Sequence, residues 1–365
     1  MKRILLTSAA VLCAQSAFAG GLDRSGQSIS ALFEDGRYAE FSLGSIAPDV
    51  SGTDVAAFGS QPTGSVANSY FQIGAAYKAD VNDRFSYALI FDQPYGASVE
   101  YDTTSVALGG TFADASSQSI TGLLRYELDQ GFSVYGGLRA QSIKAEVGLS
   151  GLAYGALSGY DVDMEAGTGF GYVAGVAYER PEIAMRVSLT YNSEIDHDLT
   201  TTESLSPATS TTTITSPDSF NLGFQTGVAA DTLVFGSVRY VNWDGFTVAP
   251  ATLNAVAGPL VEYTRDTTTI TLGLGRKFTE EWSGAVTLGY EDGGDPLVSP
   301  LGPTNGFTSI GLGGTYTSGN QKITAGVRYV MPGDASAETG TPDTARADFT
   351  GSSVLALGVK FAFQL

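Results

Sequence analysis

The stretch SVLALGVKFAFQL, residues 353–365, decides the fold. Every second residue from Leu355 to Leu365 is apolar, and Lys360 and Gln364 stand between them. A period of two predicts a β-strand with one apolar and one polar face. Residues 322–331 and 70–79 repeat the pattern. The chain is therefore expected to be all-β, either a soluble sandwich with its apolar faces inside or a membrane barrel with its apolar faces toward lipid.

The spacing of the connections favours the barrel. Transmembrane barrels have short periplasmic turns and longer external loops. Six short and seven long connections alternate here, which predicts a transmembrane antiparallel β-barrel of fourteen strands over residues 37–365, with both ends periplasmic. The short turns lie near residues 81–83, 128–131, 180–181, 229–231, 279–280 and 318–320, and the long loops near 47–67, 102–116, 148–160, 199–213, 244–262, 292–305 and 332–348.

Composition agrees with this prediction and excludes other classes. The 365 residues include 19 Lys and Arg against 38 Asp and Glu, and the formal net charge of −19 disfavours binding to nucleic acid. No run of about 18 apolar residues occurs in the body of the chain, which excludes a helical membrane bundle. The 43% hydrophobic content argues against disorder.

Two segments precede the expected barrel. Residues 1–19 have the positive start, apolar core and A-F-A cleavage site of a secretory signal peptide, and they contain the single cysteine, Cys13. Residues 20–36 lack clean alternation. Within them Ile29, Leu32 and Phe33 are spaced for one helical turn, which favours a short plug (hatch) in the barrel mouth. A disordered periplasmic tail is the alternative.

Two of the long loops are unusually apolar. They cover residues 148–160 and 246–261, and exposed apolar surface of this kind typically marks binding. Packing of the two loops on one another, as a lid, is the alternative. The residues concerned are Leu149, Leu152, Tyr154, Leu157, Phe246 and Leu253.

The third strand is interrupted. Residues 85–91 alternate well, the pattern stops over residues 92–96, and it resumes over residues 97–101. Pro94 cannot donate a ladder hydrogen bond and Gly96 allows a bend. Unpaired backbone at membrane depth is tolerated where it lines a cavity or an opening. We therefore expect a lateral opening at Pro94, Tyr95 and Gly96, with an early strand end at Pro94 as the alternative.

Several segments resemble the FadL-type outer-membrane transporters of long-chain fatty acids and other hydrophobic compounds. They are YAEFSLGSIAPDVSGTD (38–54), VNDRFSYALIFDQPYGASVEY (81–101), GFGYVAGVAYE (169–179), MRVSLTYNSEIDHDL (185–199), TSPDSF (215–220) and VNWDGF (241–246). The resemblance implies a barrel with an N-terminal hatch and a kinked third strand. It also implies a route in which a lipid docks on the outer loops, enters the barrel and leaves sideways into the outer leaflet. The hatch is shorter here than in the family, and its N-P-A segment is missing.

Basic residues on the polar faces of the strands are candidates for holding a carboxylate head group in the lumen. Arg125 and Arg139 lie on adjacent expected strands, with Tyr135 on the same face, and they are the leading pair. Ion pairs within the lumen are the alternative.

Enzyme signals are weak. His197 is the single histidine, at the outer end of a strand, where we expect a solvated rim residue. We therefore expect no catalytic activity, no cofactor and no metal ion, and a monomer in the bacterial outer membrane. The expected partners are a long-chain fatty acid or other hydrophobic small molecule and outer-membrane lipid or lipopolysaccharide. A general porin for small hydrophilic solutes and a structural or adhesive barrel are the rival functions.

Overall fold

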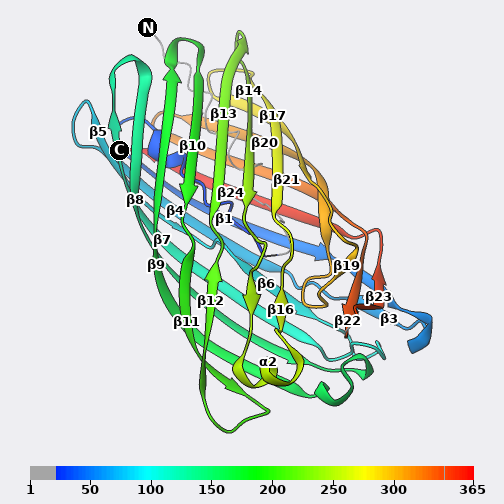
Figure 1. Ribbon diagram of the computed structural model, residues 1–365. Coiled ribbons are helices and arrows are strands. Elements are labelled where there is room, and N and C mark those ends of the chain that lie inside the picture. The colour runs from blue at the N-terminus through cyan, green and yellow to red at the C-terminus, as the bar shows by residue number, and fades with distance from the viewer. Residues whose placement is uncertain (1–21, 341) are drawn as a thin grey trace.

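The computed structural model describes residues 22–340 and 342–365, so the expected signal peptide lies outside the described residues. Figure 1 shows a long barrel of tilted antiparallel strands. Seventeen strand segments form one sheet, which closes because β1 (Tyr38–Asp49) pairs with β24 (Ser353–Gln364) along its whole length. Three wall strands consist of two consecutive segments each, so the closed wall has the expected fourteen strands.

Short turns and long loops alternate around the wall as the sequence predicted. The remaining wall strands are β4 (Tyr70–Asp80), β5 (Phe85–Asp92) with β6 (Gly96–Glu100), β7 (Phe112–Glu127), β8 (Phe132–Leu149), β9 (Tyr160–Arg180), β10 (Met185–Asn192) with β11 (Ile195–Glu203), β12 (Ser210–Ser216) with β13 (Ser219–Ala229), β14 (Thr232–Val241), β17 (Thr267–Lys277), β18 (Trp282–Glu291), β20 (Asn305–Ser318) and β21 (Gln321–Gly333).

The half of the barrel that carries the short turns is apolar outside and polar inside. On β24, Leu355, Leu357 and Phe361 are exposed while Lys360 is buried in the lumen. Aromatic pairs such as Phe132–Tyr178 and Trp282–Tyr316, with ring centroids 4.7 Å and 4.9 Å apart, lie near the short turns. Further aromatic contacts lie higher on the wall, where Tyr191 contacts Tyr172 and Phe220. An apolar outer band between aromatic girdles is the pattern that lipid requires. No helix among residues 22–340 and 342–365 is long and apolar enough to cross a membrane.

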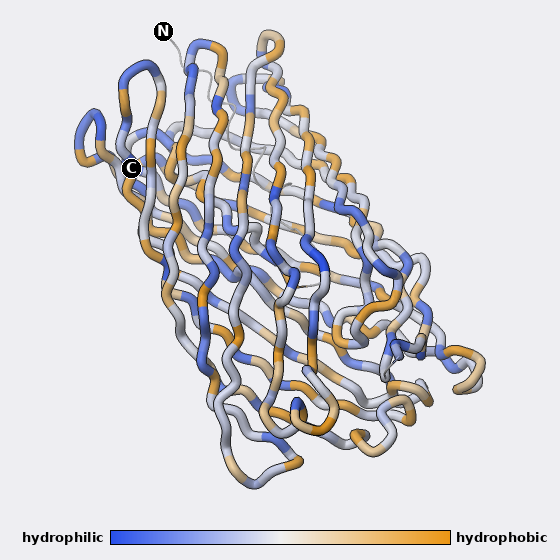
Figure 2. Tube along the Cα trace, viewed as in Figure 1, coloured by the Kyte–Doolittle hydropathy of each residue, from blue (hydrophilic) through white to orange (hydrophobic). Residues whose placement is uncertain are grey.

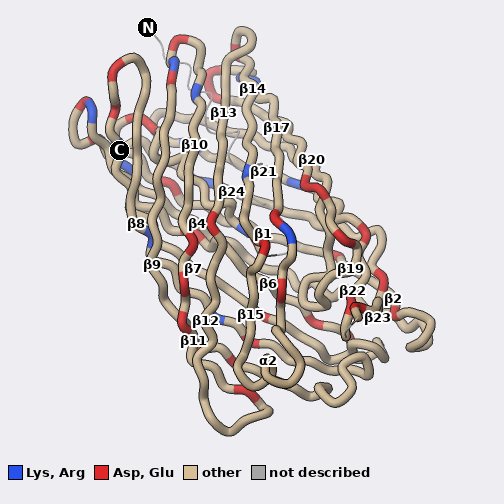
Figure 3. Tube along the Cα trace, viewed as in Figure 1, with Lys and Arg blue, Asp and Glu red and all other residues tan. Residues whose placement is uncertain are grey.

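The polarity reverses in the half that carries the long loops, which we call the outer half. On β8, the inward residues change from Arg139 and Gln141 to Val147, while Lys144 and Glu146 face outside. The odd-numbered residues of β8 point inward throughout, so only their polarity changes. The register of β8 against β9 shifts between Ile143 and Ala145, where β9 has one extra residue. This β-bulge exchanges the two faces of β9, whose inward residues are even-numbered up to Met164 and odd-numbered from Gly167. Figure 2 shows the apolar residues of the strands, and Figure 3 shows acidic residues along β9 and β11 in this half.

The long loops fold into small structures at the outer end. A five-stranded sheet is built from β19 (Leu297–Val298), β22 (Ala335–Thr339), β23 (Thr344–Phe349), β2 (Ser51–Asp54) and β3 (Pro62–Ser65). A second unit consists of β15 (Thr247–Val248), α2 (Ala251–Ala257) and β16 (Val261–Glu262). The 3-10 turns are η2 (Ser30–Phe33), η3 (Ala56–Phe58), η4 (Asp129–Gly131), η5 (Leu152–Leu157) and η6 (Pro181–Ile183).

Three strands of the wall are interrupted. One interruption, residues 93–95 between β5 and β6, is the one that the sequence predicted, and the strand resumes beyond it instead of ending there. The others, at residues 193–194 and 217–218, were not predicted, although Pro217 marks the second of them. At residues 93–95 the neighbouring strand lacks a strand partner on that side in the described part of the chain, since β4 starts at Tyr70 but pairs with β5 only from Ala75 onward. We call residues 93–95 the break.

Residues 22–37, the N-terminal segment, contact side chains of strands from several sides of the lumen. Leu32 is fully buried, and the ring of Phe33 packs edge-on against Tyr135 of β8 at 5.7 Å. Glu34 lies 3.9 Å from Lys322 of β21. The expected helical turn is present as the 3-10 turn η2. These contacts place the segment inside the barrel.

Candidate functional site

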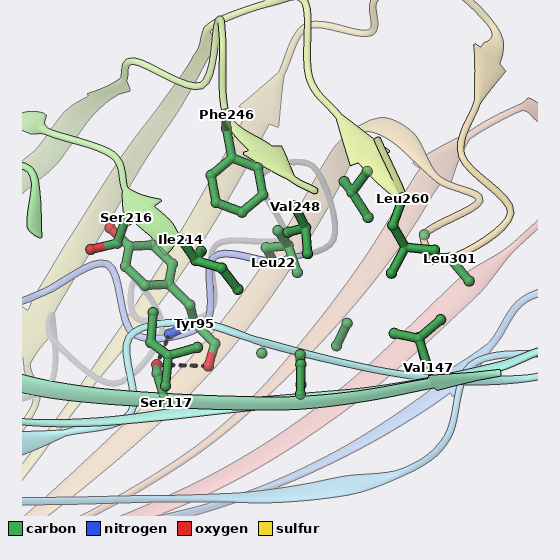
Figure 4. Close-up of a pocket in the computed structure, with 18 of the residues that line it drawn as sticks. Leu22, Tyr95, Ser117, Val147, Ile214, Ser216, Phe246, Val248, Leu260 and Leu301 are labelled. Atoms are coloured by element: carbon green, nitrogen blue, oxygen red, sulfur yellow. Dashed lines mark hydrogen bonds between the residues drawn. The ribbon is translucent and has the colours of Figure 1, made fainter. Parts of the chain in front are cut away.

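An apolar cavity of about 100 Å³ lies inside the outer half of the barrel. Since one water-sized occupant needs roughly 10–15 Å³ of such space, there is room for about seven to ten heavy atoms. Figure 4 shows side chains from distant strands and loops converging on it. We call it the main cavity. Its wall includes Ala113, Ile143, Ala145, Val147, Met164 and Ile214, all from the part of the strands where apolar side chains point inward.

Aromatic rings form one side of the main cavity. Trp243 is fully buried and meets Tyr95, Phe246 and Tyr263 in edge-on contacts, with centroids 5.7 Å, 5.1 Å and 5.4 Å away. All four residues line the cavity. Because edge-on aromatic contacts are geometrically specific, this cluster fixes the shape of the cavity and ties the break to the loop that follows β14.

The apolar loops that the sequence singled out pack together over the cavity. Leu149 and Leu253 are buried in one cluster with Met164 and Ile214, and Tyr154, Leu157 and Phe246 pack against that cluster. Leu152 is 69% exposed and takes no part. The packing of the two loops on one another, the alternative expectation, is therefore what the structure shows. Of the named residues, Phe246 also lines the main cavity.

Glu203, at the outer end of β11, holds the lid in place. Its carboxylate accepts hydrogen bonds from the backbone N–H groups of Thr252 and Leu253 at 2.8 Å each, and from the Tyr160 hydroxyl at 3.0 Å. Burial favours the neutral acid, but the hydrogen bonds outweigh it and lower the pKa of Glu203. An ionised carboxylate at the start of α2 thus joins the lid to the barrel wall.

The break lies next to the main cavity, and the N-terminal segment closes it from inside. The Arg24 N–H donates to the Pro94 carbonyl at 2.8 Å, and the Gly96 N–H donates to the Leu22 carbonyl at 2.9 Å. Asp23 and Tyr95 are antiparallel bridge partners. Residues 22–24 therefore provide hydrogen-bond partners for backbone groups of the break that no neighbouring strand pairs.

A buried ion pair anchors this part of the N-terminal segment. The Asp23 carboxylate lies 2.5 Å from Nε of Arg239 on β14, and both side chains are almost completely buried. Arg239 also donates to the Gln27 side chain and to Asn221 on β13. Ser25 donates to Asp92 on β5 at 2.7 Å, on the other side of the break. Displacing residues 22–25 would therefore require separation of a buried ion pair.

A second, smaller cavity of about 70 Å³, the side cavity, continues from the main cavity toward the break. The two cavities adjoin and share six lining positions: Leu22, Gly96, Ala97, Tyr263, Leu301 and Gly302. Arg24, Tyr70 and Ser98 line the side cavity on the side away from the main one. An apolar path thus leads from beneath the lid to the gap between β4 and β6.

The expected head-group residues lie below this path, at two different levels. Arg125 and Tyr135 are direct cross-strand partners, whereas Arg139 opposes Thr121, four positions along β7. Arg125 forms an ion pair with Glu179, and the Tyr135 hydroxyl contacts Thr190 at 2.8 Å. Both therefore already have partners within the protein. Arg139 is buried, and its Nε donates to Thr121 at 2.8 Å.

The structure corrects the expectation for His197. This side chain is fully buried in the lumen, where it contacts Gln141 at 3.2 Å and the Gly167 carbonyl at 3.3 Å. The interruption at residues 193–194 places the odd-numbered residues of β11 inward, so His197 points away from solvent. Among the residues that the structure describes, no three His, Cys, Asp or Glu side chains form a group that could hold a metal ion.

Sequence reasoning missed the roles of Asp23, Arg24, Glu203 and Trp243. It placed Arg239 among the lumen-facing bases but did not foresee its ion pair with Asp23. The contacts of Asp23 with Arg239 and of Glu203 with α2 join distant parts of the chain and leave no local pattern. Trp243 had a signal, because it is one of only two tryptophans and lies beside an apolar loop.

Comparison with known proteins agrees with this geometry. The family model described as "Outer membrane protein transport protein (OMPP1/FadL/TodX)" matches residues 39–363. The crystal structure of a Pseudomonas aeruginosa FadL homologue is similar, with a TM-score of 0.73 at 15% identity over 98% of this chain and 99% of that one. The P. putida toluene transporter TodX gives 0.66 at 13% identity over 92% and 91%. The Ralstonia pickettii toluene transporter TbuX gives 0.64 at 15% over the same shares. No curated protein matches the sequence significantly.

Proposed function

Because the chain belongs to the OMPP1/FadL/TodX family, and is thus an outer-membrane channel for hydrophobic compounds and not an enzyme, we propose that it takes up fatty acids or similar amphiphiles by lateral exit through the break. The cargo enters beneath the apolar lid, fills the main cavity, passes the side cavity and leaves between β4 and β6 into the outer leaflet. No energy source is needed, since both ends of the path are apolar.

The observation that carries this proposal is the change of lumen polarity at the level of the break. Above that level the side chains that line the main cavity are mainly apolar, and below it the inward side chains include Arg139, Gln141 and Ser119. An apolar chain that descended through this lower lumen would leave an apolar environment for a polar one. Lateral exit keeps it out of water throughout.

The N-terminal segment acts as the gate in this proposal. It seals the break by hydrogen bonds from residues 22–24, and it occupies part of the lumen below, beside a cavity of about 200 Å³. A ligand that enters the side cavity meets Leu22 and Arg24 and competes with the contacts that hold them. Movement of residues 22–25 away from the break then opens the wall to the outer leaflet.

Of the expected head-group residues, we propose Arg139 as the lumen base. Its guanidinium lies close to Tyr95, which lines the main cavity, and Asp92 is a neighbouring carboxylate. Arg125 and Tyr135 serve instead to dock the N-terminal segment, since Phe33 packs on both of them.

Uptake and conductance together test the proposal. Cells that lack the gene should regain uptake of labelled oleate when the protein is restored. The purified barrel in a planar bilayer should show little steady ion conductance. A large steady conductance without fatty acid uptake would support the general porin, and neither activity would support a structural barrel.

A further inference from the structure

The Arg24 side chain leaves the lumen through the break. Gly96 pairs with Ser116 on β7, and the neighbouring Ser117 faces the lumen, where its hydroxyl bonds the Tyr95 backbone. Ser116 and the missing side chain of Gly96 therefore face the outer surface. A Cβ atom on Gly96 would lie 2.6 Å from Cζ and Nη1 of Arg24. The guanidinium thus lies in the opening of the wall between Gly96 of β6 and Tyr70 of β4, in the space that glycine leaves free.

The surroundings of this guanidinium leave its charge without a close partner. It stacks on the Tyr70 ring with Cζ 3.9 Å from the centroid. Asp114, on the outer face of β7, acts on it electrostatically, yet within the described residues no carboxylate forms an ion pair with Arg24. Asp114 instead accepts a hydrogen bond from Ser98 at 3.3 Å. A half-buried cation in this state has free donors for an anion.

Arg186 stacks on Phe33 and donates to Gln225, but three other basic side chains in the barrel interior have carboxylate partners. Arg239 is paired with Asp23, Arg125 with Glu179 and Lys360 with Glu40. Each pair holds the barrel interior together. Arg24 belongs to the gate itself, but its charged end points away from that interior.

We propose that Arg24 forms an anion site on the outer face of the break, which takes the carboxylate or phosphate head group of an amphiphile in the outer leaflet. The inference rests on the proposed lateral exit. An anion bound there accepts hydrogen bonds from the guanidinium only while the anion lies at the outer face of the break. The site therefore favours amphiphiles with an acidic head group as they leave the barrel. The head group comes either from the transported molecule or from a resident lipid, and both offer the same oxygen chemistry.

Transport into vesicles tests the site with two solutes of equal chain length, dodecanoate and dodecanol. Arg24→Met is compared with Lys144→Met, which removes an exposed outward cation on β8 in the same cross-strand row as Gly96, two strands away. This control separates a specific effect of Arg24 from the effect of positive charge near the break. Each protein is placed in phosphatidylcholine vesicles with and without phosphatidic acid. Loss of a charge-assisted contact should slow dodecanoate about tenfold in Arg24→Met and leave dodecanol unchanged, whereas Lys144→Met should behave as wild type.

The vesicle composition identifies the source of the anion. An Arg24 effect on dodecanoate in phosphatidylcholine alone supports the transported carboxylate. An Arg24 effect on either solute that requires phosphatidic acid supports the lipid phosphate. If Arg24→Met matches Lys144→Met with both solutes in both vesicles, the anion site is wrong. If wild type moves neither solute, the proposed function itself is wrong.

Asp114→Asn provides an independent test in the opposite direction. Asp114 is exposed, and its substitution leaves Arg24 in place while removing the carboxylate that competes for it. Binding of dodecanoate should become about twofold to fivefold tighter, in line with a weak exposed electrostatic contact. Unchanged or weaker binding would overturn the site even if Arg24→Met fails to fold.

Discussion

The two halves of this barrel follow opposite rules along the same strands. On β9, Phe170 and Tyr172 face outside near the middle of the wall, while Val162 and Met164 face inside near the outer end. The lower half is built for lipid around it, and the outer half is built like a soluble protein with an apolar interior. The difference shows where an apolar cargo is stable. In the outer half it is stable within the barrel, and in the lower half it is stable in the lipid around the barrel. The break lies where these two environments meet.

A charge inside the outer half should have the largest effect on transport. Ile214 and Thr213 are neighbours on β12, with Ile214 facing the main cavity and Thr213 facing solvent. Ile214→Asp places a carboxylate in an apolar cavity at a cost of several kcal/mol, which predicts at least a hundredfold weaker binding of dodecanol. Thr213→Asp should change binding less than twofold. Calorimetric titration in detergent measures both, and equal effects would refute the difference between the faces.

Release of the N-terminal segment from the break should have the second largest effect. Asp23→Asn leaves Arg239 buried without its anion, which should destabilise docking of the N-terminal segment by about 3 kcal/mol. We expect larger and noisier ion conductance in a planar bilayer. Asp129→Asn is the matched control, because Asp129 pairs with Arg84 at 3.1 Å on the exposed surface, where solvent screens the pair. Quiet channels in both variants would show that residues 22–25 do not gate the lumen.

Substitutions of the two lumen arginines, Arg139 and Arg125, should have different effects: the first on ligand binding and the second on stability. Arg139→Gln should weaken dodecanoate binding about tenfold, because a charge-assisted contact to the head group is lost, and leave dodecanol binding unchanged. Arg125→Gln removes the partner of Glu179 and should lower the melting temperature without changing the preference between the two ligands. Identical ligand preference in wild type and Arg139→Gln would remove Arg139 from the site.

The smallest effect concerns the lid at low pH. The lowered pKa of Glu203 means that its ionised form stabilises the folded lid above the ordinary glutamate pKa. That contribution, about 1 kcal/mol for a helix cap, is lost as the pH falls through the lowered pKa. Amide exchange of α2, corrected for its intrinsic pH dependence, should therefore accelerate between pH 7 and pH 3 in wild type. Glu203→Gln should lack this pH dependence, and an identical pH response in the variant would contradict the role of Glu203.

Local patterns predicted the wall and one break, but not what fills the barrel. Period-two alternation and loop lengths are local, so fourteen strands and the interruption at Pro94 were visible in the sequence. The inward turn of His197 depends on a second interruption, which flips the face of β11. The pairing of Asp23 with Arg239 spans 216 positions, and only the closed barrel brings those residues together. The apolar loops were recognised as functional, but their union with Trp243 and Tyr95 into one cavity required the fold.

A reversible lock on the gate tests lateral exit most directly. Asp23 and Tyr95 are bridge partners of the type without direct hydrogen bonds, whose Cα atoms lie about 4.5 Å apart, within the range for a disulfide. The expected exported chain has no other cysteine. The Asp23→Cys, Tyr95→Cys variant should transport dodecanol into vesicles when reduced and should stop when oxidised, because the N-terminal segment is then fixed across the break. Equal transport by the reduced and fully oxidised protein would contradict the lateral route.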